Sequence, residues 1–305
     1  MTKKLEKSNF TLVPLDSEGE WNWPLLENAA AMSGADCVFA SSGPAGEGLR
    51  PGILPLDEVL AGFRHVVACE AVRSSVNVYD FPAPRGKTAV IVGNEVKGIP
   101  PSILKKADNI VSIPMAGTGI TSVNVAVSAA TALYALSGDF GRKKQRRSNL
   151  LQRDVDILIH APADPHELGS LLRSVWAFGW RRVYLDDSHG VWFTSNQKTV
   201  LDSRAAARRH KNPLTVLAAE QIEYAEYDAV LRCNSDRHGS PLSRLSLPGG
   251  PRLLIVIGDE YMGDAIPGET DFSSYVDFAS SEVQGRFRHT GSIFLSMVSQ
   301  MVKLG

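Results

Sequence analysis

The chain repeats two spacings of residues, and this repetition constrains the fold more than any other feature. Gly93 and Ile113 are 20 residues apart in the first half, and Gly258 and Phe278 are 20 apart in the second. The other repeated spacing is 12 residues, from Asn22 to Gly34 and from Glu167 to Gly179. The middle segment differs, with 59 residues between Gly34 and Gly93 and 79 between Gly179 and Gly258. We therefore expect two copies of one structural plan, the second with an insertion.

The stretch from Val90 to Leu133 is the most informative part of the first copy. It includes most of one apolar, β-branched run, Thr88–Val92, and all of a second, Asn109–Ile113. Each run ends in a loop of small residues, and the second loop leads into an Ala-rich helical pattern. Short apolar runs of this kind are typical of buried parallel strands. Loops at the carboxyl ends of such strands are where α/β proteins bind ligands.

The order of strand and helix patterns predicts an α/β fold with mostly parallel sheets. Further strands are expected over residues 10–16, 36–42, 65–72, 154–162, 181–187, 214–222, 227–233, 252–263 and 274–282, and helices over 21–36 and 164–180. A polar, basic segment separates the halves. We expect a first domain at 1–138, a linker at 139–152 and a second domain at 153–305.

Composition limits the class of protein. The 305 residues are 44% hydrophobic and 21% charged, with a net charge of −1, which fits a globular protein with a sizeable core. No run approaches the roughly 18 apolar residues of a membrane span, and the start has no signal-peptide pattern. The three cysteines lack paired spacing, and no metal-ligand spacing is present. We expect a cytoplasmic protein with reduced thiols and no bound metal.

Two basic patches stand out against the near-neutral charge. Both suit contact with RNA phosphates, although solvated surface explains either patch equally well. Their residues are Arg142, Lys143, Lys144, Arg146 and Arg147 in the linker, and Arg204, Arg208, Arg209 and Lys211 in the second half.

Two motifs in the first half carry a family resemblance. The first is Val92–Gly98, which reads VGNEVKG, and the second joins Ile113–Gly117 (IPMAG) to Ser122–Ala129 (SVNVAVSA). Together, and each following a strand, they resemble the SpoU/TrmH family of SPOUT-class RNA ribose 2′-O-methyltransferases. The resemblance implies a trefoil-knot α/β domain that binds S-adenosylmethionine (AdoMet). The cofactor-binding positions that it implies are Val92, Gly93, Asn94, Gly98, Ile113, Met115, Gly117, Ser122 and Val123.

The family's remaining motif, D-P-x-N-x-G-x-x-x-R, is divided between the halves. The first half keeps Asn22 but has Asn28 at the arginine position. The second half keeps Arg173 but has Glu167 at the asparagine position, and its third motif is replaced, with Phe287–His289 in place of Ser-x-Asn. Because family members are homodimers with a shared site, the resemblance implies an intramolecular pseudo-dimer of two tandem domains. The chain would act as a monomer with one composite site.

The resemblance also implies roles for three residues. Arg173 would be catalytic; we favour a phosphate clamp that stabilises an oxyanion over a base, because guanidinium stays protonated. Asn124 would orient the hydroxyl or the cofactor, and Glu95 would fix loop geometry or act as a capping carboxylate. Arg286, Arg288 and His289 are expected either to contact RNA or to lie in a solvated turn.

The expected function is AdoMet-dependent 2′-O-methylation of tRNA or rRNA ribose. An inactive RNA-binding protein with the same fold is the main alternative, because both halves have lost motif residues. A nucleotide-binding dehydrogenase is a remote alternative, since the chain lacks G-x-G-x-x-G after its first strand.

Overall fold

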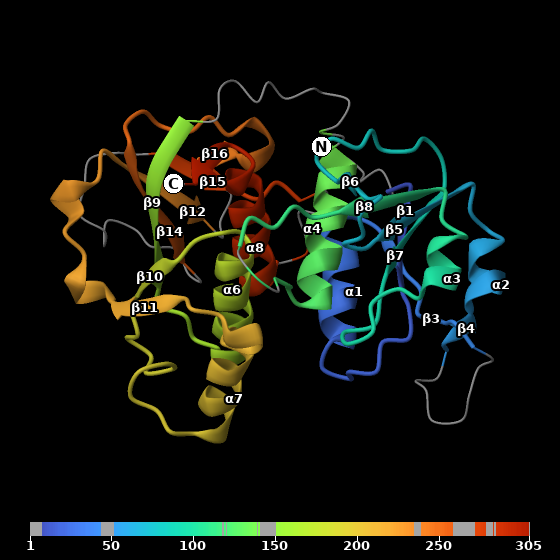
Figure 1. The fold of residues 1–305 in the computed structure, drawn as a ribbon, viewed down its shortest axis with the longest axis horizontal. Helices are drawn as coiled ribbons and strands as arrows, with labels where there is room; N and C mark the ends of the chain where they lie inside the picture. The colour runs from blue at the N-terminus through green and yellow to red at the C-terminus, as the bar shows by residue number, and fades with distance from the viewer. Residues whose placement is uncertain are drawn as a thin grey trace, which may run out of the picture. The chain divides into compact units, whose positions relative to one another are not determined.

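The computed structural model divides into two compact units (Figure 1). It describes residues 8–43, 52–117, 119, 121–138, 140, 151–234, 239–258, 272–278, 283 and 285–304. The first unit comprises Met1–Pro114, Asn124–Arg146 and Phe278–Gly285, and the second comprises Met115–Val123, Arg147–Asp277 and Arg286–Gly305. The segment Met115–Val123 thus clusters with the second unit, although the chain on both sides of it belongs to the first.

The first unit is built on a parallel sheet with the strand order β2-β1-β7-β5-β8-β6. Its strands are β1 (Phe10–Pro14), β2 (Asp36–Cys37), β5 (His65–Cys69), β6 (Val76–Asn77), β7 (Thr88–Val92) and β8 (Asn109–Ser112). A separate pair joins β3 (Ala40–Ser41) to β4 (Leu54–Pro55). The central strand β7 is buried along its whole length, which explains its unbroken apolar sequence.

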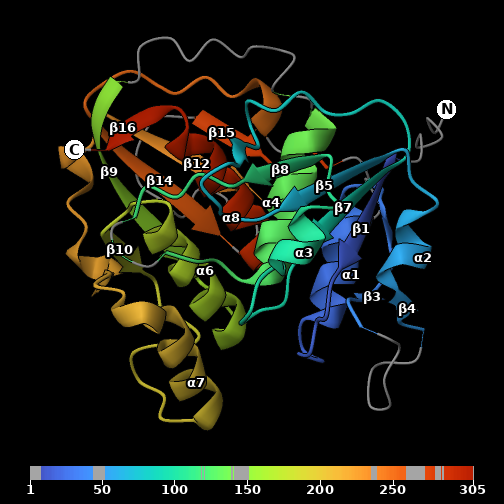
Figure 2. The ribbon, with the colours of Figure 1, turned by 45° about the vertical axis from the view of Figure 1, so that its right-hand side comes forward.

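Helices cover both faces of this sheet (Figure 2). On one face lie α1 (Trp23–Met32) and the Ala-rich α4 (Val125–Gly138), which pack on each other. On the other face, α2 (Leu56–Leu60) and α3 (Pro101–Leu104) contribute Leu56 and Ile103 to a core with Ile91 of β7. The sheet is therefore buried on both sides, as expected for parallel strands.

The second unit contains a parallel sheet with the strand order β11-β10-β9-β14-β12-β15-β13. Its strands are β9 (Leu151–His160), β10 (Arg182–Leu185), β11 (Thr215–Ala218), β12 (Ala229–Asn234), β13 (Ser240–Pro241), β14 (Arg252–Gly258) and β15 (Phe272–Tyr275). A further strand, β16 (Val302–Leu304), pairs with the start of β9. Without β11 and β16, the order matches that of the first sheet strand for strand.

Three helices complete the described part of the second unit, with short 3-10 turns between its strands. They are α6 (Pro165–Ala177), α7 (Lys198–Ala207) and α8 (Phe287–Ser299). Asp164 caps α6 by accepting from the backbone N–H of His166 at 2.7 Å. α7 packs so closely on α6 that a Cβ at Gly169 would lie only 2.6 Å from the backbone oxygen of Ser203. This approach explains the glycine.

Most of the predicted strands and helices are present, with shifts at their ends. The strand expected over 274–282 overlaps β15 only at 274–275, and residues 276–278 are not in a strand. The expected strand over residues 36–42 is split into β2 and β3, and the one over 214–222 ends at Ala218 and continues as a 3-10 turn. β9 begins at Leu151, earlier than expected, because Leu151–Arg153 pairs with β16 near the end of the chain. Most of the expected linker, including Arg142, Lys143, Lys144, Arg146 and Arg147, lies outside the described residues.

Candidate active site

The loop after β7 closes on itself. Asn94 and Gly98 exchange backbone hydrogen bonds of 3.2 and 3.0 Å. A Cβ at Gly93 would lie 2.3 Å from the carbonyl carbon of Gly98, and Gly98 has a φ of +65°. Both glycines are therefore required by the loop's own geometry. The loop lies at the carboxyl end of a central strand, the place where parallel sheets present ligand sites.

Asn94 uses its side chain to hold this loop. Its Nδ2 donates to the backbone oxygen of Asp16 at 2.7 Å, and its Oδ1 accepts from the N–H groups of Val96 and Lys97. The side chain is buried and its hydrogen bonds are internal. Because its backbone N–H is also bonded to Gly98, Asn94 acts by shaping the loop.

Glu95 and Asn124 meet in a polar network centred on Asn22. The Nδ2 of Asn22 donates to Glu95 Oε1 at 2.9 Å, and its Oδ1 accepts from Asn124 Nδ2 at 3.0 Å. The hydroxyl of Ser17 also donates to Glu95 Oε1, at 2.8 Å. Asn124 additionally accepts from the N–H of Ala126 in the first turn of α4. Asn22 was not among the residues expected in the site, although its position in the divided motif was a signal that could have identified it.

The segment Met115–Val123 packs on α6 within the second unit. Gly117 donates its N–H to the oxygen of Ala177 at 3.1 Å, and a Cβ at Gly117 would lie 2.5 Å from the oxygen of Trp176. Val123 is buried, as is Ile113 just before the segment, while Met115 and Ser122 are partly buried. The segment carries no charged side chain, so a ligand would meet its backbone groups and neutral side chains.

Arg173 on α6 binds Ser122 with two hydrogen bonds. Its Nε donates to the Ser122 backbone oxygen at 2.7 Å, and an Nη group donates to the Ser122 hydroxyl. Burial, and secondly the positive charge of Arg209, lower the pKa of Arg173 to about 10. Arg173 therefore remains protonated at neutral pH, with N–H groups left over for a ligand.

The second basic patch lies at the end of α7 and in the following 3-10 turn, Arg209–Lys211. The Arg204 guanidinium lies 5.8 Å from the centre of the Trp192 ring, and Arg208, Arg209 and Lys211 are exposed. Of this patch, Arg209 contributes, after burial, to the lowered pKa of Arg173.

The expected exposure of Arg288 and His289 is wrong. Arg288 is 8% exposed and forms an ion pair with Glu167, itself 6% exposed, with Nε and Oε1 2.8 Å apart. The Arg288 backbone N–H also donates to Glu167 Oε2 at 2.9 Å. Phe287 and His289 are buried beside them, and only Arg286 of this group is exposed. The unusual residues at these motif positions pair with each other, which excludes Arg288 and His289 from contact with RNA in this state.

Other kinds of site were sought in the same residues. Within the described ranges, no three or more His, Cys, Asp or Glu side chains are grouped so as to hold a metal ion. None of the helices in that part of the chain combines the length and hydropathy needed to cross a bilayer. Cys37, Cys69 and Cys233 are free thiols.

Comparisons with known proteins agree with the sequence motifs. Residues 56–134 match the model of the SpoU rRNA Methylase family. A curated relative, an uncharacterized tRNA/rRNA methyltransferase YfiF of Escherichia coli, is 28% identical over 137 residues. The match covers 41% of this chain and 36% of the relative, so the chain spans about a third of that relative's length.

Solved structures of similar proteins cover less than half of the chain in two representative cases. The TrmH/SpoU tRNA modifying enzyme of A. aeolicus is 23% identical, with a TM-score of 0.37 over 46% of this chain and 80% of that one. An AdoMet-bound rRNA methyltransferase from Sinorhizobium meliloti is 16% identical, with a TM-score of 0.36 over 46% of this chain and 58% of that one. The family model and the curated relative are therefore the comparisons that bear on function.

The buried Glu167–Arg288 pair gives a first prediction. Glu167→Ala leaves the Arg288 charge buried without its partner, so we expect a loss of about 3–5 kcal/mol in the free energy of unfolding. Glu167→Leu combined with Arg288→Met removes both charges and should recover most of that loss. Urea unfolding followed by tryptophan fluorescence measures both changes. The matched control is Glu220→Ala at an exposed position, expected to change stability by less than about 0.5 kcal/mol. A double variant as unstable as Glu167→Ala would contradict this account.

His289 gives a second prediction, on pH. Burial, followed by the charges of Arg288 and Arg286, lowers its pKa to about 3, against 6.5 in the unfolded chain. Between these values the unfolded state binds the extra proton, so His289 lowers stability as the pH falls, by at most about 1.4 kcal/mol per pH unit. Stability measured from pH 7 to 4 should fall less in His289→Met than in the original chain. His189→Met, at an exposed histidine, should leave the profile unchanged; parallel profiles for all three proteins would refute the prediction.

Proposed function

We propose that this protein, whose residues 56–134 match the model of the SpoU rRNA Methylase family, is an AdoMet-dependent RNA ribose 2′-O-methyltransferase with one composite active site. The observation that carries the proposal is the contact of Arg173 with Ser122. It joins the arginine retained by the second half to the cofactor motif retained by the first. The tRNA/rRNA methyltransferase name of the curated relative supports RNA as the substrate.

AdoMet fits the chemistry of the two motif loops. The sulfonium cofactor carries a positive charge, and Ile113–Val123 itself offers it backbone groups and neutral side chains. The neighbouring cation, Arg173, is engaged with Ser122. The residues proposed to hold it are Val92, Gly93, Asn94, Gly98, Ile113, Met115, Gly117, Ser122 and Val123. When bound, AdoMet supplies the methyl group for an in-line displacement by a ribose 2′-oxygen.

Arg173 serves in this proposal as a clamp for the substrate. Ser122 fixes the guanidinium, and its remaining N–H groups can bind a phosphate oxygen or the oxygen on which negative charge develops. Its pKa of about 10 keeps more than 99% of it protonated at pH 7, which argues against a role as general base. Asn124 and Glu95, linked through Asn22, would orient the ribose hydroxyl or the cofactor.

A tandem duplication with one degenerate copy accounts for the second half. The shared strand order of the two sheets supports it, as does the repeated spacing. At the positions of Asn22 and Val123, the second half has Glu167 and Arg288, whose buried ion pair occupies the place of the first half's polar network. We propose trefoil-knot domains at 1–138 and 153–305, joined by the segment 139–152 and acting as an intramolecular pseudo-dimer. In this arrangement a single chain provides one complete site.

An inactive RNA-binding protein is the second candidate. Asn28 at the first half's arginine position and Glu167 at the second half's asparagine position favour it. Both candidates use the same basic residues for RNA, and they differ in cofactor binding and turnover.

The number of AdoMet molecules bound is the third prediction. Calorimetric titration of the full chain should give one equivalent, because only the first half retains the motif loops. Two equivalents would refute the one-site model. The absence of binding would favour the inactive RNA-binding protein.

The role of Arg173 is the fourth prediction. Arg173→Ala should reduce methyl transfer from labelled AdoMet to total RNA of a deletion strain by about 10²–10³-fold. Its affinity for AdoMet should change by less than about 3-fold. Arg173→Lys keeps the charge but loses the planar fork, so its activity should lie between the two. Arg181→Ala, at an exposed arginine of the same unit, is the matched control; equal activity in Arg173→Ala and Arg181→Ala would overturn the assignment.

A further inference from the structure

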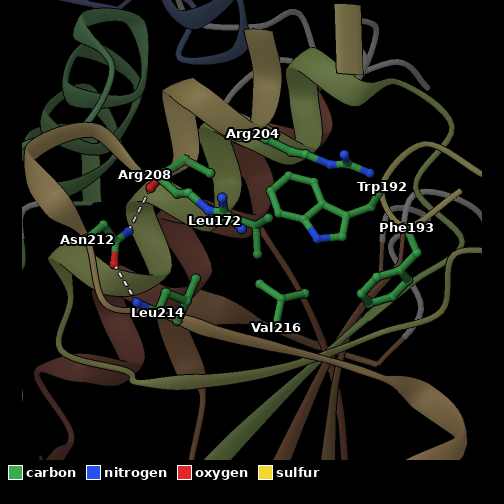
Figure 3. A pocket seen from close by; sticks show the side chains of 9 residues that line it. Leu172, Trp192, Phe193, Arg204, Arg208, Asn212, Leu214 and Val216 are labelled. Carbon is green, nitrogen blue, oxygen red and sulfur yellow. Dashed lines mark hydrogen bonds between the residues drawn. The ribbon is translucent and has the colours of Figure 1, made fainter. Parts of the chain in front are cut away.

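A cavity of about 350 Å³ lies in the insertion of the second unit (Figure 3). It is formed where β11, α7 and the segment after β10 come together, with α6 behind them. The volume is at the small end of the roughly 300–1,000 Å³ typical of ligand pockets, which suits one small ligand. Its walls are Leu172, Trp192, Phe193, Arg204, Ala207, Arg208, Asn212, Leu214 and Val216.

The aromatic wall is held in place by Asp187. Its carboxylate accepts from the backbone N–H of Trp192 at 2.9 Å and from that of Phe193 at 2.7 Å. The intervening turn is closed by a hydrogen bond from Gly190 to the Asp187 oxygen, and Gly190 has a φ of +64°. Trp192 is buried, whereas Phe193 is 43% exposed and offers an open ring face. The wall is thus fixed before any ligand arrives.

The opposite wall is cationic. The Arg204 guanidinium lies over the Trp192 ring, and Arg208 reaches toward the cavity from the end of α7, as Figure 3 shows. Among the residues that line the cavity, none is a carboxylate. Asn212 has its amide occupied internally, since Nδ2 donates to Ala207 and Oδ1 accepts from Leu214. The arginines are therefore the groups suited to bind a negatively charged ligand.

We propose that this cavity binds one unstacked nucleotide of single-stranded RNA. The Phe193 ring would stack on the base, and Arg204 and Arg208 would bind the adjacent phosphate. The apolar floor of Leu172 and Val216 and the aromatic wall suit a flat ligand group such as a base. The two arginines suit an anionic group, since none of the lining residues is a carboxylate. A nucleotide has both a flat base and an anionic phosphate. The inference rests on the proposed function insofar as it makes this ligand part of the RNA substrate.

The position of the cavity connects it to the proposed chemistry. Leu172 of its floor precedes Arg173 in α6, and Arg209 follows Arg208 of its wall. Arg209 is close enough to Arg173 to act on its charge. A phosphate chain running from the cavity past Arg209 toward Arg173 would neutralise three neighbouring cations. The cavity would therefore hold a nucleotide near the methylated one rather than the methylated nucleotide itself.

Binding of mononucleotides to the full chain tests the proposal, and is the fifth prediction. Titration calorimetry compares AMP, GMP, CMP and UMP with inorganic phosphate, on the original chain and on Phe193→Ala and Arg208→Gln. We expect the nucleotides to bind more tightly than phosphate, and each variant to bind them about 10-fold more weakly. Lys198→Gln, which removes one exposed cation from the same helix outside the cavity, is the control and should bind as the original chain does. Phe193 is exposed, so its loss should leave the thermal unfolding temperature unchanged.

The remaining outcomes overturn the proposal. Phosphate binding as tight as nucleotide binding, with no effect of Phe193→Ala, would reduce the cavity to an anion patch. No nucleotide binding at all would leave it without the proposed ligand. Because these titrations contain no AdoMet, their failure is distinguishable from failure of the proposed function, which the AdoMet stoichiometry and the Arg173 variants test separately.

Discussion

The pairing of Arg173 with Ser122 is the interaction on which the proposed site depends. It holds a loop that is bounded on both sides by the first unit against a helix of the second. Small residues make this possible, because Gly117 approaches the end of α6 so closely that a Cβ would meet the Trp176 oxygen. The guanidinium adds two hydrogen bonds to the backbone hydrogen bond of Gly117 that also holds the loop, so its removal would weaken the attachment to α6 without releasing the loop. One side chain therefore contributes both to loop position and to the charge of the proposed site.

On the duplication that we propose, two positions of the first half's proposed site are occupied in the second half by a buried ion pair. In the first half, Asn22 and Asn124 are neutral, partly buried and joined by a single hydrogen bond, so their geometry can adapt to a ligand. In the second half, Glu167 and Arg288 are charged and nearly fully buried. Burying two charges is costly unless each satisfies the other, so the pair must stay closed. On the duplication that we propose, the two changes compensate each other, since either one alone would bury an unpaired charge.

Much of this structure follows from local sequence patterns, and the exceptions have a common cause. The strands β7 and β14 could be predicted because their apolar runs are typical of strands that are buried on both faces. The burial of Arg288 could not, because it depends on a partner 121 residues away in the chain. The same holds for the start of β9, which exists because β16 pairs with it. Asn22 falls between these cases: its motif position was visible, but its contacts with Glu95 and Asn124 required the fold.

The location of the insertion is consistent with a division of labour between the halves. The added β11 and α7 extend the outer edge of the second sheet beyond β10, leaving the shared strand order intact. The insertion carries Arg204, Arg208 and Arg209. After burial, the positive charge of Arg209 lowers the pKa of Arg173, which is the effect of repulsion between these two like charges. Such repulsion is relieved when an anion binds between like charges, which gives phosphate a differential advantage over neutral ligands. On the one-site model that we propose, the second half holds no cofactor, and these cationic groups would serve to hold RNA.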